Sequence, residues 1–179
     1  MKMLALDHSR LASLPSLTYV SSFVHCVSKM RIEDEAVWAS LASYLAERHD
    51  QFDARNLSTV TYALANISRL KPIILNFDDL FRKFELSIIK KFDQDSKLDG
   101  QAIANAVLSY SKTQNGSVEF FRAIEGVVLA NYQLMSPQEL SNVLYSFQKS
   151  ENAVPDVLLE QLEDYVVENL ARYKPIELC

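Results

Sequence analysis

The stretch Leu140-Ser-Asn-Val-Leu-Tyr-Ser-Phe-Gln-Lys149 recurs, with substitutions, at three earlier places in the 179-residue chain. The four stretches align without gaps and are Val20–Lys29, Leu57–Asn66, Ile103–Lys112 and Leu140–Lys149. Their first residues are separated by 37, 46 and 37 positions. Two equal intervals and one that is nine residues longer indicate a repeated structural unit with a single insertion.

We number the ten positions of each stretch as columns 0 to 9. Columns 0, 3, 4 and 7 are mostly apolar, which is the spacing of an amphipathic helix. Columns 1 and 6 hold small residues, so a second helix can approach closely there. The apolar columns hold Val20/Phe23/Val24/Val27, Leu57/Val60/Thr61/Leu64, Ile103/Ala106/Val107/Tyr110 and Leu140/Val143/Leu144/Phe147. The small columns hold Ser21, Ser58, Ala104 and Ser141, and then Cys26, Ala63, Ser109 and Ser146.

A residue suited to capping a helix stands four positions before each stretch. These residues are Ser16, Asp53, Asp99 and Ser136. The last begins Ser136-Pro137-Gln138-Glu139, which combines a capping box with proline at the first helical position. Four helices are therefore predicted to begin at matched points.

A second helical stripe follows each first helix. Its members are Trp38/Leu41/Leu45, Phe81/Phe84/Ile88, Phe121/Ile124/Val128 and Leu159/Leu162/Val166. The unit is thus helix–turn–helix, with repeats at about 14–51, 52–94, 95–133 and 134–174. Residues 1–13 are expected to be an N-terminal cap or the end of a helix, and residues 175–179 a tail. The sequence predicts an all-α fold, an α-solenoid of about four repeats and eight principal helices, because no single hairpin can bury its apolar faces alone.

The extra residues of the second repeat fall mainly between Arg69 and Asp78. Pro72 is expected to end the preceding helix there. The apolar run Ile73-Ile74-Leu75 either packs on a partner or a neighbouring hairpin, or folds back on its own core.

The repeated pattern, and Leu140–Lys149 most closely, resembles the heptatricopeptide and octotricopeptide repeats, which are relatives of the pentatricopeptide repeat. The resemblance covers residues 14–174, and the 37-residue interval favours the heptatricopeptide type. It implies an organellar, usually mitochondrial, setting. It also implies either RNA binding or service as an accessory subunit of a large complex.

Composition excludes several classes of protein. Hydrophobic residues make up 49% and charged residues 23%, values typical of a folded domain. No apolar run is long enough to span a bilayer. Cys26 and Cys179 are too few for a disulfide framework and favour a reducing compartment. The first ten residues have neither a signal-peptide layout nor a clear presequence.

The sequence contains no group of residues with the spacing of a known catalytic or metal-binding motif. His8, His25 and His49 lack the spacing of metal ligands. Asp93, Asp95 and Asp99 lack the glycine and terminal glutamate of a calcium loop, so turn and capping roles are expected. No phosphate loop or nucleophile elbow occurs. We expect a non-enzyme with no catalytic residue, cofactor or metal.

Columns 2, 5 and 9 lie on one side of each first helix and form a candidate face for RNA or for a partner protein. Its residues are Ser22, His25, Lys29, Thr59, Tyr62, Asn66, Asn105, Lys112, Asn142, Tyr145 and Lys149. Amide, aromatic and lysine side chains could contact bases and phosphates. An ordinary solvated surface explains the same residues.

The charge distribution differs between the parts of the chain and bears on whether the ligand is RNA or a protein. The net charge is −5, and residues 113–179 hold 4 basic and 10 acidic side chains. A candidate basic patch in the second repeat comprises Arg55, Arg69, Lys71, Arg82, Lys83, Lys90 and Lys91. The leading hypothesis is an accessory or scaffold subunit of a large mitochondrial assembly, either a ribosome-like ribonucleoprotein or an energy-converting complex such as ATP synthase. The alternative is an organellar RNA-binding protein, and a free cytosolic adaptor is a third possibility.

Overall fold

A computed structural model describes residues 8–69, 77–94, 99–153 and 156–175. All regular secondary structure in these ranges is helical, as predicted. The α-helices are α1 (His8–Ala12), α2 (Leu17–Lys29), α3 (Glu35–Arg48), α4 (Ala54–Ser68), α5 (Asp78–Gln94), α6 (Gly100–Thr113), α7 (Val118–Asn131), α8 (Pro137–Lys149) and α9 (Asp156–Glu168). Short 3-10 turns are η1 (His49–Gln51), η2 (Tyr132–Leu134) and η3 (Leu170–Arg172).

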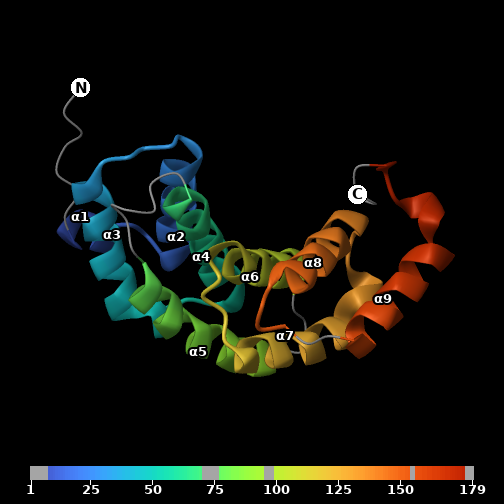
Figure 1. Cartoon of the computed structure of the whole chain (residues 1–179). Helices are drawn as coiled ribbons and strands as arrows, with labels where there is room; N and C mark the ends of the chain where they lie inside the picture. Colours follow the sequence, from blue (N-terminus) through green and yellow to red (C-terminus); the bar gives the residue numbers. More distant parts are fainter. Residues whose placement is uncertain (1–7, 70–76, 95–98, 154–155, 176–179) are drawn as a thin grey trace.

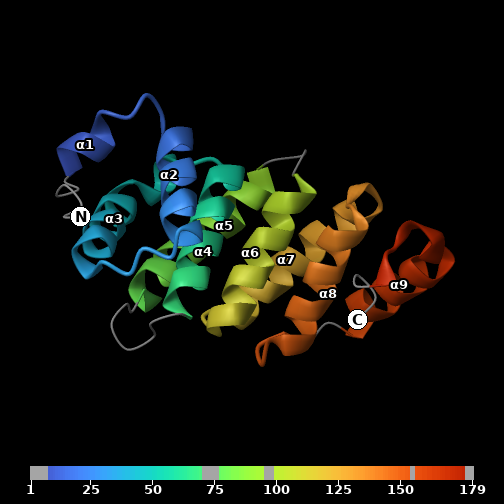
Figure 2. The same ribbon diagram turned by 90° about the horizontal axis from the view of Figure 1, so that it is seen from above.

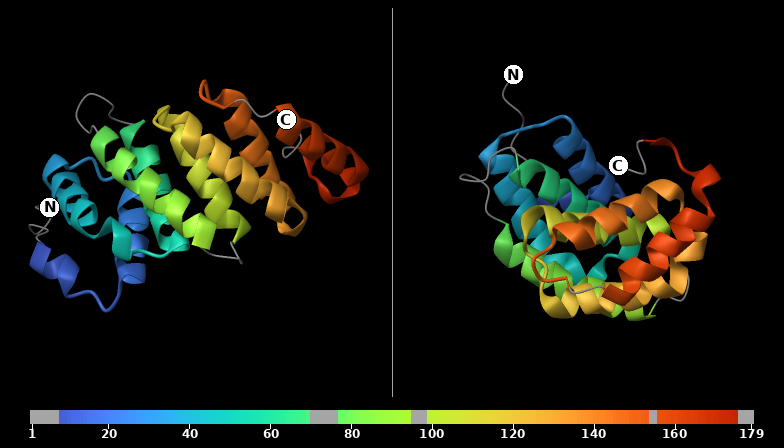
Figure 3. Two further views of the ribbon diagram at one scale, coloured as in Figure 1. Left: turned by 90° about the horizontal axis from the view of Figure 1, so that it is seen from below. Right: turned by 45° about the vertical axis from the view of Figure 1, so that its right-hand side comes forward.

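The helices form two layers. The first helices of the repeats pack on one another in chain order, α2 on α4, α4 on α6 and α6 on α8. The second helices follow alongside, with α3 on α5 and α5 on α7, and α1 contacts α3. Figure 1 shows the two layers as an arch with α2, α4, α6 and α8 on its inner side. Seen from above and below, the hairpins lie side by side in chain order (Figures 2 and 3).

Helix starts are fixed by capping side chains. Five N-cap side chains accept hydrogen bonds from backbone N–H groups of the first turn: Asp34, Asp53, Asp99, Ser117 and Ser136. At α8 the predicted capping box is complete, because Glu139 also accepts a 2.7 Å hydrogen bond from the Ser136 N–H. Ser16 is the N-cap of α2 as predicted, but its side chain makes no capping hydrogen bond.

The core is the set of apolar columns. Of the sixteen residues in columns 0, 3, 4 and 7, fourteen are fully buried. The two exceptions, Phe23 on α2 and Leu144 on α8, are half-buried. α4 and α6 pack between two first helices, whereas α2 packs on α4 and α8 packs on α6. The terminal members of the layer therefore bury less of the same stripe.

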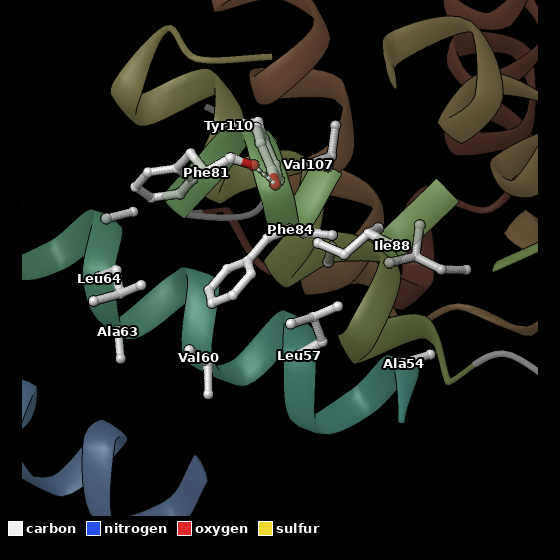
Figure 4. Packing of buried hydrophobic residues seen from close by; sticks show 14 of the residues in the cluster. Ala54, Leu57, Val60, Ala63, Leu64, Phe81, Phe84, Ile88, Val107 and Tyr110 are labelled. Atoms are coloured by element: carbon white, nitrogen blue, oxygen red, sulfur yellow. Dashed lines mark hydrogen bonds between the residues drawn. The ribbon is translucent and has the colours of Figure 1, made fainter. Parts of the chain in front are cut away.

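The second helices complete this core. On α5 the side chains of Phe81, Phe84 and Ile88 face the apolar side of α4, including Leu57 and Leu64 (Figure 4). The predicted stripes of α3, α5 and α7 are all fully buried.

The stripe predicted for α9 is only partly buried, and the fully buried residue at its start is Leu158 rather than Leu159. Leu158 and Leu162 are fully buried, whereas Leu159 and Val166 are half-buried. α9 belongs to the last hairpin and packs on α8, so its orientation is not fixed by a neighbour on each side as that of α5 is.

Buried and partly buried hydrogen bonds connect the second hairpin to the third. The Tyr110 hydroxyl of α6 donates to the Phe81 carbonyl of α5 at 2.8 Å (Figure 4). Burial raises the pKa of Tyr110 well above its ordinary value, with a further contribution from nearby Glu85. The Glu85 carboxylate accepts hydrogen bonds from the N–H and the hydroxyl of Ser117, the residue that caps α7. These bonds fix the position of the third hairpin on the second.

Part of the predicted organisation lies outside the described residues. Most of the insertion is in this category, including Pro72 and the run Ile73–Leu75. The same is true of residues 1–7 and 176–179. Within the described part of the expected N-terminal cap, α1 contributes Leu11, which is fully buried.

Replacing Val143 by Asp is expected to destabilise the fold by about 3 kcal/mol or more, because a carboxylate without a partner would be buried between α6 and α8. Urea unfolding followed by circular dichroism measures the effect. Val157→Asp is the matched control, since Val157 on α9 is 59% exposed and its replacement should change stability by no more than about 0.5 kcal/mol. Equal unfolding midpoints for the two variants would contradict the assignment of the core.

Candidate functional site

The structure brings part of the predicted face together across three first helices. His25 of α2, Tyr62 and Asn66 of α4, and Lys112 of α6 form a contact group that we call the Tyr62 cluster. The rings of His25 and Tyr62 stack with centroids 6.4 Å apart. The Lys112 ammonium lies 4.8 Å from the Tyr62 ring centroid and donates to the Asn66 side-chain carbonyl at 3.3 Å. The cluster therefore joins the first three repeats.

The environment of the cluster disfavours positive charge. Burial lowers the pKa of His25, and the nearby Lys29 cation lowers it further. The Nδ1 atom of His25 is buried without a hydrogen-bond partner. Burial also lowers the pKa of Lys112, an effect to which Arg69 adds and which Tyr62 opposes. Lys112 is thus held by the tyrosine face and the Asn66 amide rather than projecting into water.

The two tyrosines of column 5, Tyr62 and Tyr145, differ in how accessible their rings are. Tyr62 is half-buried, and one face of its ring is occupied by Lys112. Tyr145, the equivalent residue on α8, is 49% exposed. A base or a partner side chain can therefore stack on Tyr145 without displacing a lysine, whereas at Tyr62 it would have to break an existing contact.

The remaining residues of the candidate face are not brought into the cluster. Ser22 is exposed, Asn105 and Asn142 are half-buried, and Thr59 donates to the Arg55 carbonyl at 2.9 Å within its own helix. Lys29 and Lys149 are exposed in the last turns of α2 and α8. Cations in a last turn also suit the helix dipole, so their position has a structural explanation.

The candidate basic patch is divided between the two ends of the second hairpin. Arg55 lies in the first turn of α4, whereas Arg69 follows its last turn, about 21 Å farther along the helix axis. Arg55 is ion-paired with Asp99 at 3.2 Å. Lys91, in the last turn of α5, donates to the Asp50 carbonyl at 2.9 Å and so belongs to the Arg55 end.

The other members of the patch follow the same division. Arg82 and Lys83 lie near the beginning of α5, and Arg82 is 3.7 Å from Asp79. Lys90 is exposed near the end of the same helix. Lys71 lies outside the described residues. The six members of the patch that the structure describes do not form one continuous surface for phosphate.

A depression that sequence reasoning missed lies between α3 and α5. Its volume is about 550 Å³, and its lining includes Ala42 and Ala46 from α3 and Phe77, Asp79 and Lys83 from the second hairpin. Only the packing of two hairpins creates it, and the sequence carries no signal for that placement. Among the described residues, no three His, Cys, Asp or Glu side chains form a group that could hold a metal ion. None of the described helices has the length and apolarity needed to cross a membrane.

No family model, no curated protein and no solved structure matches the chain in comparisons with known proteins.

The pKa of His25 predicts a pH dependence of stability. Because this pKa is lowered in the folded state, the unfolded chain binds the proton more readily as the pH falls. Stability should therefore decrease from about pH 7.5 to about pH 5.5, the range in which an ordinary histidine gains its proton. Urea unfolding should show a smaller decrease for His25→Gln, and an intermediate one for Lys29→Met, which removes the nearby cation. An identical decrease in all three proteins would contradict this assignment.

The contact between Lys112 and Tyr62 can be tested by a double-mutant cycle. Lys112→Met, Tyr62→Leu and the double variant should show a coupling free energy of about 0.5–1 kcal/mol if the ammonium lies over the ring. Lys112→Met combined with Tyr19→Leu is the matched control, because Tyr19 lies on α2, two first helices away from α6. The control pair should be additive, and additivity of the test pair would show that the two side chains are independent.

Proposed function

We propose that this chain is an α-solenoid helical-repeat protein without catalytic activity. It serves as an accessory or scaffold subunit of a large mitochondrial assembly and acts through protein–protein contacts. Four consecutive hairpins, each packed on its neighbours, support the solenoid description. The resemblance of Leu140–Lys149 and its three equivalents to heptatricopeptide repeats supports the mitochondrial setting. A ribosome-like ribonucleoprotein or an energy-converting complex such as ATP synthase is the candidate host.

The observation that carries the proposal is the location of exposed apolar side chains. Among the described residues, the large hydrophobic side chains that remain exposed are Tyr19, Met30, Leu86, Leu134, Tyr145, Val157, Val167 and Leu170. All except Leu86 lie in the first hairpin, in the last hairpin or in the turn that leads into the last hairpin. These side chains are concentrated in the hairpins at the two ends, and exposed apolar patches are typical of contact surfaces with other macromolecules. The two ends of the stack are therefore the proposed contact regions.

The charge of the last hairpin favours a protein partner. Glu160, Glu163, Asp164 and Glu168 are exposed on α9. These carboxylates would repel a phosphate backbone and suit a basic protein surface. Val157 and Val167, exposed on the same helix, add apolar area to this acidic surface.

One observation favours RNA as a second candidate ligand. Tyr145 has an exposed ring, and Lys149 follows one helical turn later on α8 with its side chain also exposed. An aromatic ring beside a cation is suited to a stacked base and its phosphate. The Tyr62 cluster supports RNA less well, because its tyrosine and lysine already contact each other.

Co-sedimentation with native mitochondrial complexes tests the proposed function. The wild-type protein should sediment with a heavy complex, and Leu134→Ser combined with Val167→Ser should reduce the bound fraction by removing exposed apolar area from the last hairpin. Leu86→Ser is the matched control, since Leu86 is 72% exposed on α5, in the middle of the stack. Ribonuclease treatment separates an RNA-dependent host from a protein scaffold. Failure of the wild-type protein to sediment with any complex would overturn the proposal.

Titration of labelled single-stranded RNA decides between the two candidates. We expect binding no tighter than about micromolar at physiological salt, within the non-specific range. If RNA were the main ligand, Tyr145→Ala would weaken binding by about 1–3 kcal/mol without changing the melting temperature. Tyr62→Ala should instead lower the melting temperature, because it removes the contact with Lys112. A nanomolar, sequence-selective complex lost on Tyr145→Ala would favour the RNA-binding alternative.

A further inference from the structure

The same helix–helix interface occurs three times in the first-helix layer, between α2 and α4, α4 and α6, and α6 and α8. Hydrogen bonds between α2 and α4 show which columns face the following helix and which face the preceding one. The hydroxyl of Ser28, which is column 8 of α2, donates to the carbonyl of Ala63, column 6 of α4, at 2.9 Å. The hydroxyl of Ser21, column 1 of α2, donates to the side chain of Asn56, one position before column 0 of α4, at 2.6 Å. Columns 1 and 8 thus face the following helix. Column 6 and the position before column 0, seven residues apart, face the preceding helix.

The side that faces a preceding helix is buried wherever such a helix is present. On α4, α6 and α8, columns 3 and 6 are fully buried: Val60, Ala63, Ala106, Ser109, Val143 and Ser146. On α2 the equivalent Phe23 is half-buried and Cys26 is exposed. Tyr19 and Met30 continue this side by one turn in each direction and are 58% and 71% exposed. No other first helix among the described residues covers an apolar stripe on α2, which we call the α2 stripe and which consists of Tyr19, Phe23, Cys26 and Met30.

The opposite side becomes uncovered at the other end of the layer. Columns 1, 4 and 8 are fully buried on α2, α4 and α6: Ser21, Val24, Ser28, Ser58, Thr61, Ala65, Ala104, Val107 and Ser111. On α8 the equivalent Leu144 is half-buried and Gln148 is exposed. Tyr145, beside Leu144, is exposed as well. We call Leu144, Tyr145 and Gln148 the α8 face.

We infer that a second copy of this chain docks head to tail, with the α8 face of one copy on the α2 stripe of the next. The two uncovered surfaces are the two halves of the interface that already joins α2 to α4, α4 to α6 and α6 to α8. A second copy therefore continues the first-helix layer in the register that the chain uses internally. This proposal rests on the repeated packing and not on the mitochondrial host, although both proposals assign Tyr19, Met30 and Tyr145 to a contact surface.

The symmetry of this contact determines which assemblies the chain forms. The interface is heterologous, since different surfaces of the two copies meet, and each docked copy leaves one free end. Association therefore gives open chains of increasing length rather than a closed dimer. One helix–helix contact is small compared with the area of about 1,200 Å² or more that stable complexes bury, so assembly should depend strongly on protein concentration.

Sedimentation equilibrium of the full chain under reducing conditions is the first test. The weight-average mass should rise continuously with concentration beyond that of the 20.4 kDa monomer. Cys26→Arg places a long cationic side chain where the interface uses alanine or serine, and it should restore the monomer mass without changing the melting temperature. A monomer mass for the wild-type protein at every concentration would overturn the proposal.

Site-directed cross-linking tests the register. In a Cys179→Ser background Cys26 is the one remaining thiol, and Gln148→Cys adds a second thiol at column 8. By analogy with Ser28 and Ala63, this column lies against column 6 of the next helix, where Cys26 stands. Oxidation with diamide, which takes up the two electrons and two protons of the paired thiols, should give disulfide-linked dimers and longer chains on a non-reducing gel. Lys149→Cys is the matched control, because its thiol lies one position farther round the helix.

A mixing experiment distinguishes head-to-tail from symmetric contact. Both chains carry Cys179→Ser, so each has one thiol. A chain with Cys26→Ser and Gln148→Cys is mixed with a chain that has Cys26 and native Gln148. The mixture should form cross-linked dimers and nothing longer. Cross-links that are equally abundant for Gln148→Cys and Lys149→Cys would show random collision. Dimers formed mainly through Cys26 of both copies would show a symmetric contact. Either result overturns the proposed register.

Discussion

The rest of the structure depends on the burial of each first helix between its neighbours. Val60, Val107 and Val143 are fully buried because α4, α6 and α8 each lie against another first helix. Small side chains allow this close approach, as the 2.9 Å hydrogen bond from Ser28 to the Ala63 carbonyl shows. Stability in such an arrangement comes from nearest-neighbour contacts, so the loss of one interface uncovers two apolar surfaces at once.

The same close packing determines the properties of the candidate site. His25, Tyr62 and Lys112 come from three different first helices and meet only because these helices stack in register. Packing removes water from the cluster, and this desolvation is the main reason why the pKa values of His25 and Lys112 are lowered. Residues that repeat as a polar surface in the sequence therefore include structural contacts in the folded chain.

The sequence predicted the helical fold, the caps at Asp53, Asp99 and Ser136, and nearly all of the core, because these depend on local spacing. It was wrong for the start of the α9 stripe, where Leu158 replaces Leu159 in the core, since that orientation depends on tertiary packing. The contact between Lys112 and Tyr62, the division of the basic patch and the depression between α3 and α5 depend on distances between hairpins. A column alignment gives no such distances.

A column of this repeat has one role where a neighbouring helix covers it and another where none does. Column 6 is fully buried as Ala63, Ser109 and Ser146, yet as Cys26 it is exposed. In the middle of the stack the column 5 residue Tyr62 contacts Lys112 with its ring. At the end of the stack the column 5 residue Tyr145 has an exposed ring. A column that is packed in the middle of the layer is thus exposed at its end. The exposure of these columns therefore follows from their position in the layer, with no change in the repeat itself.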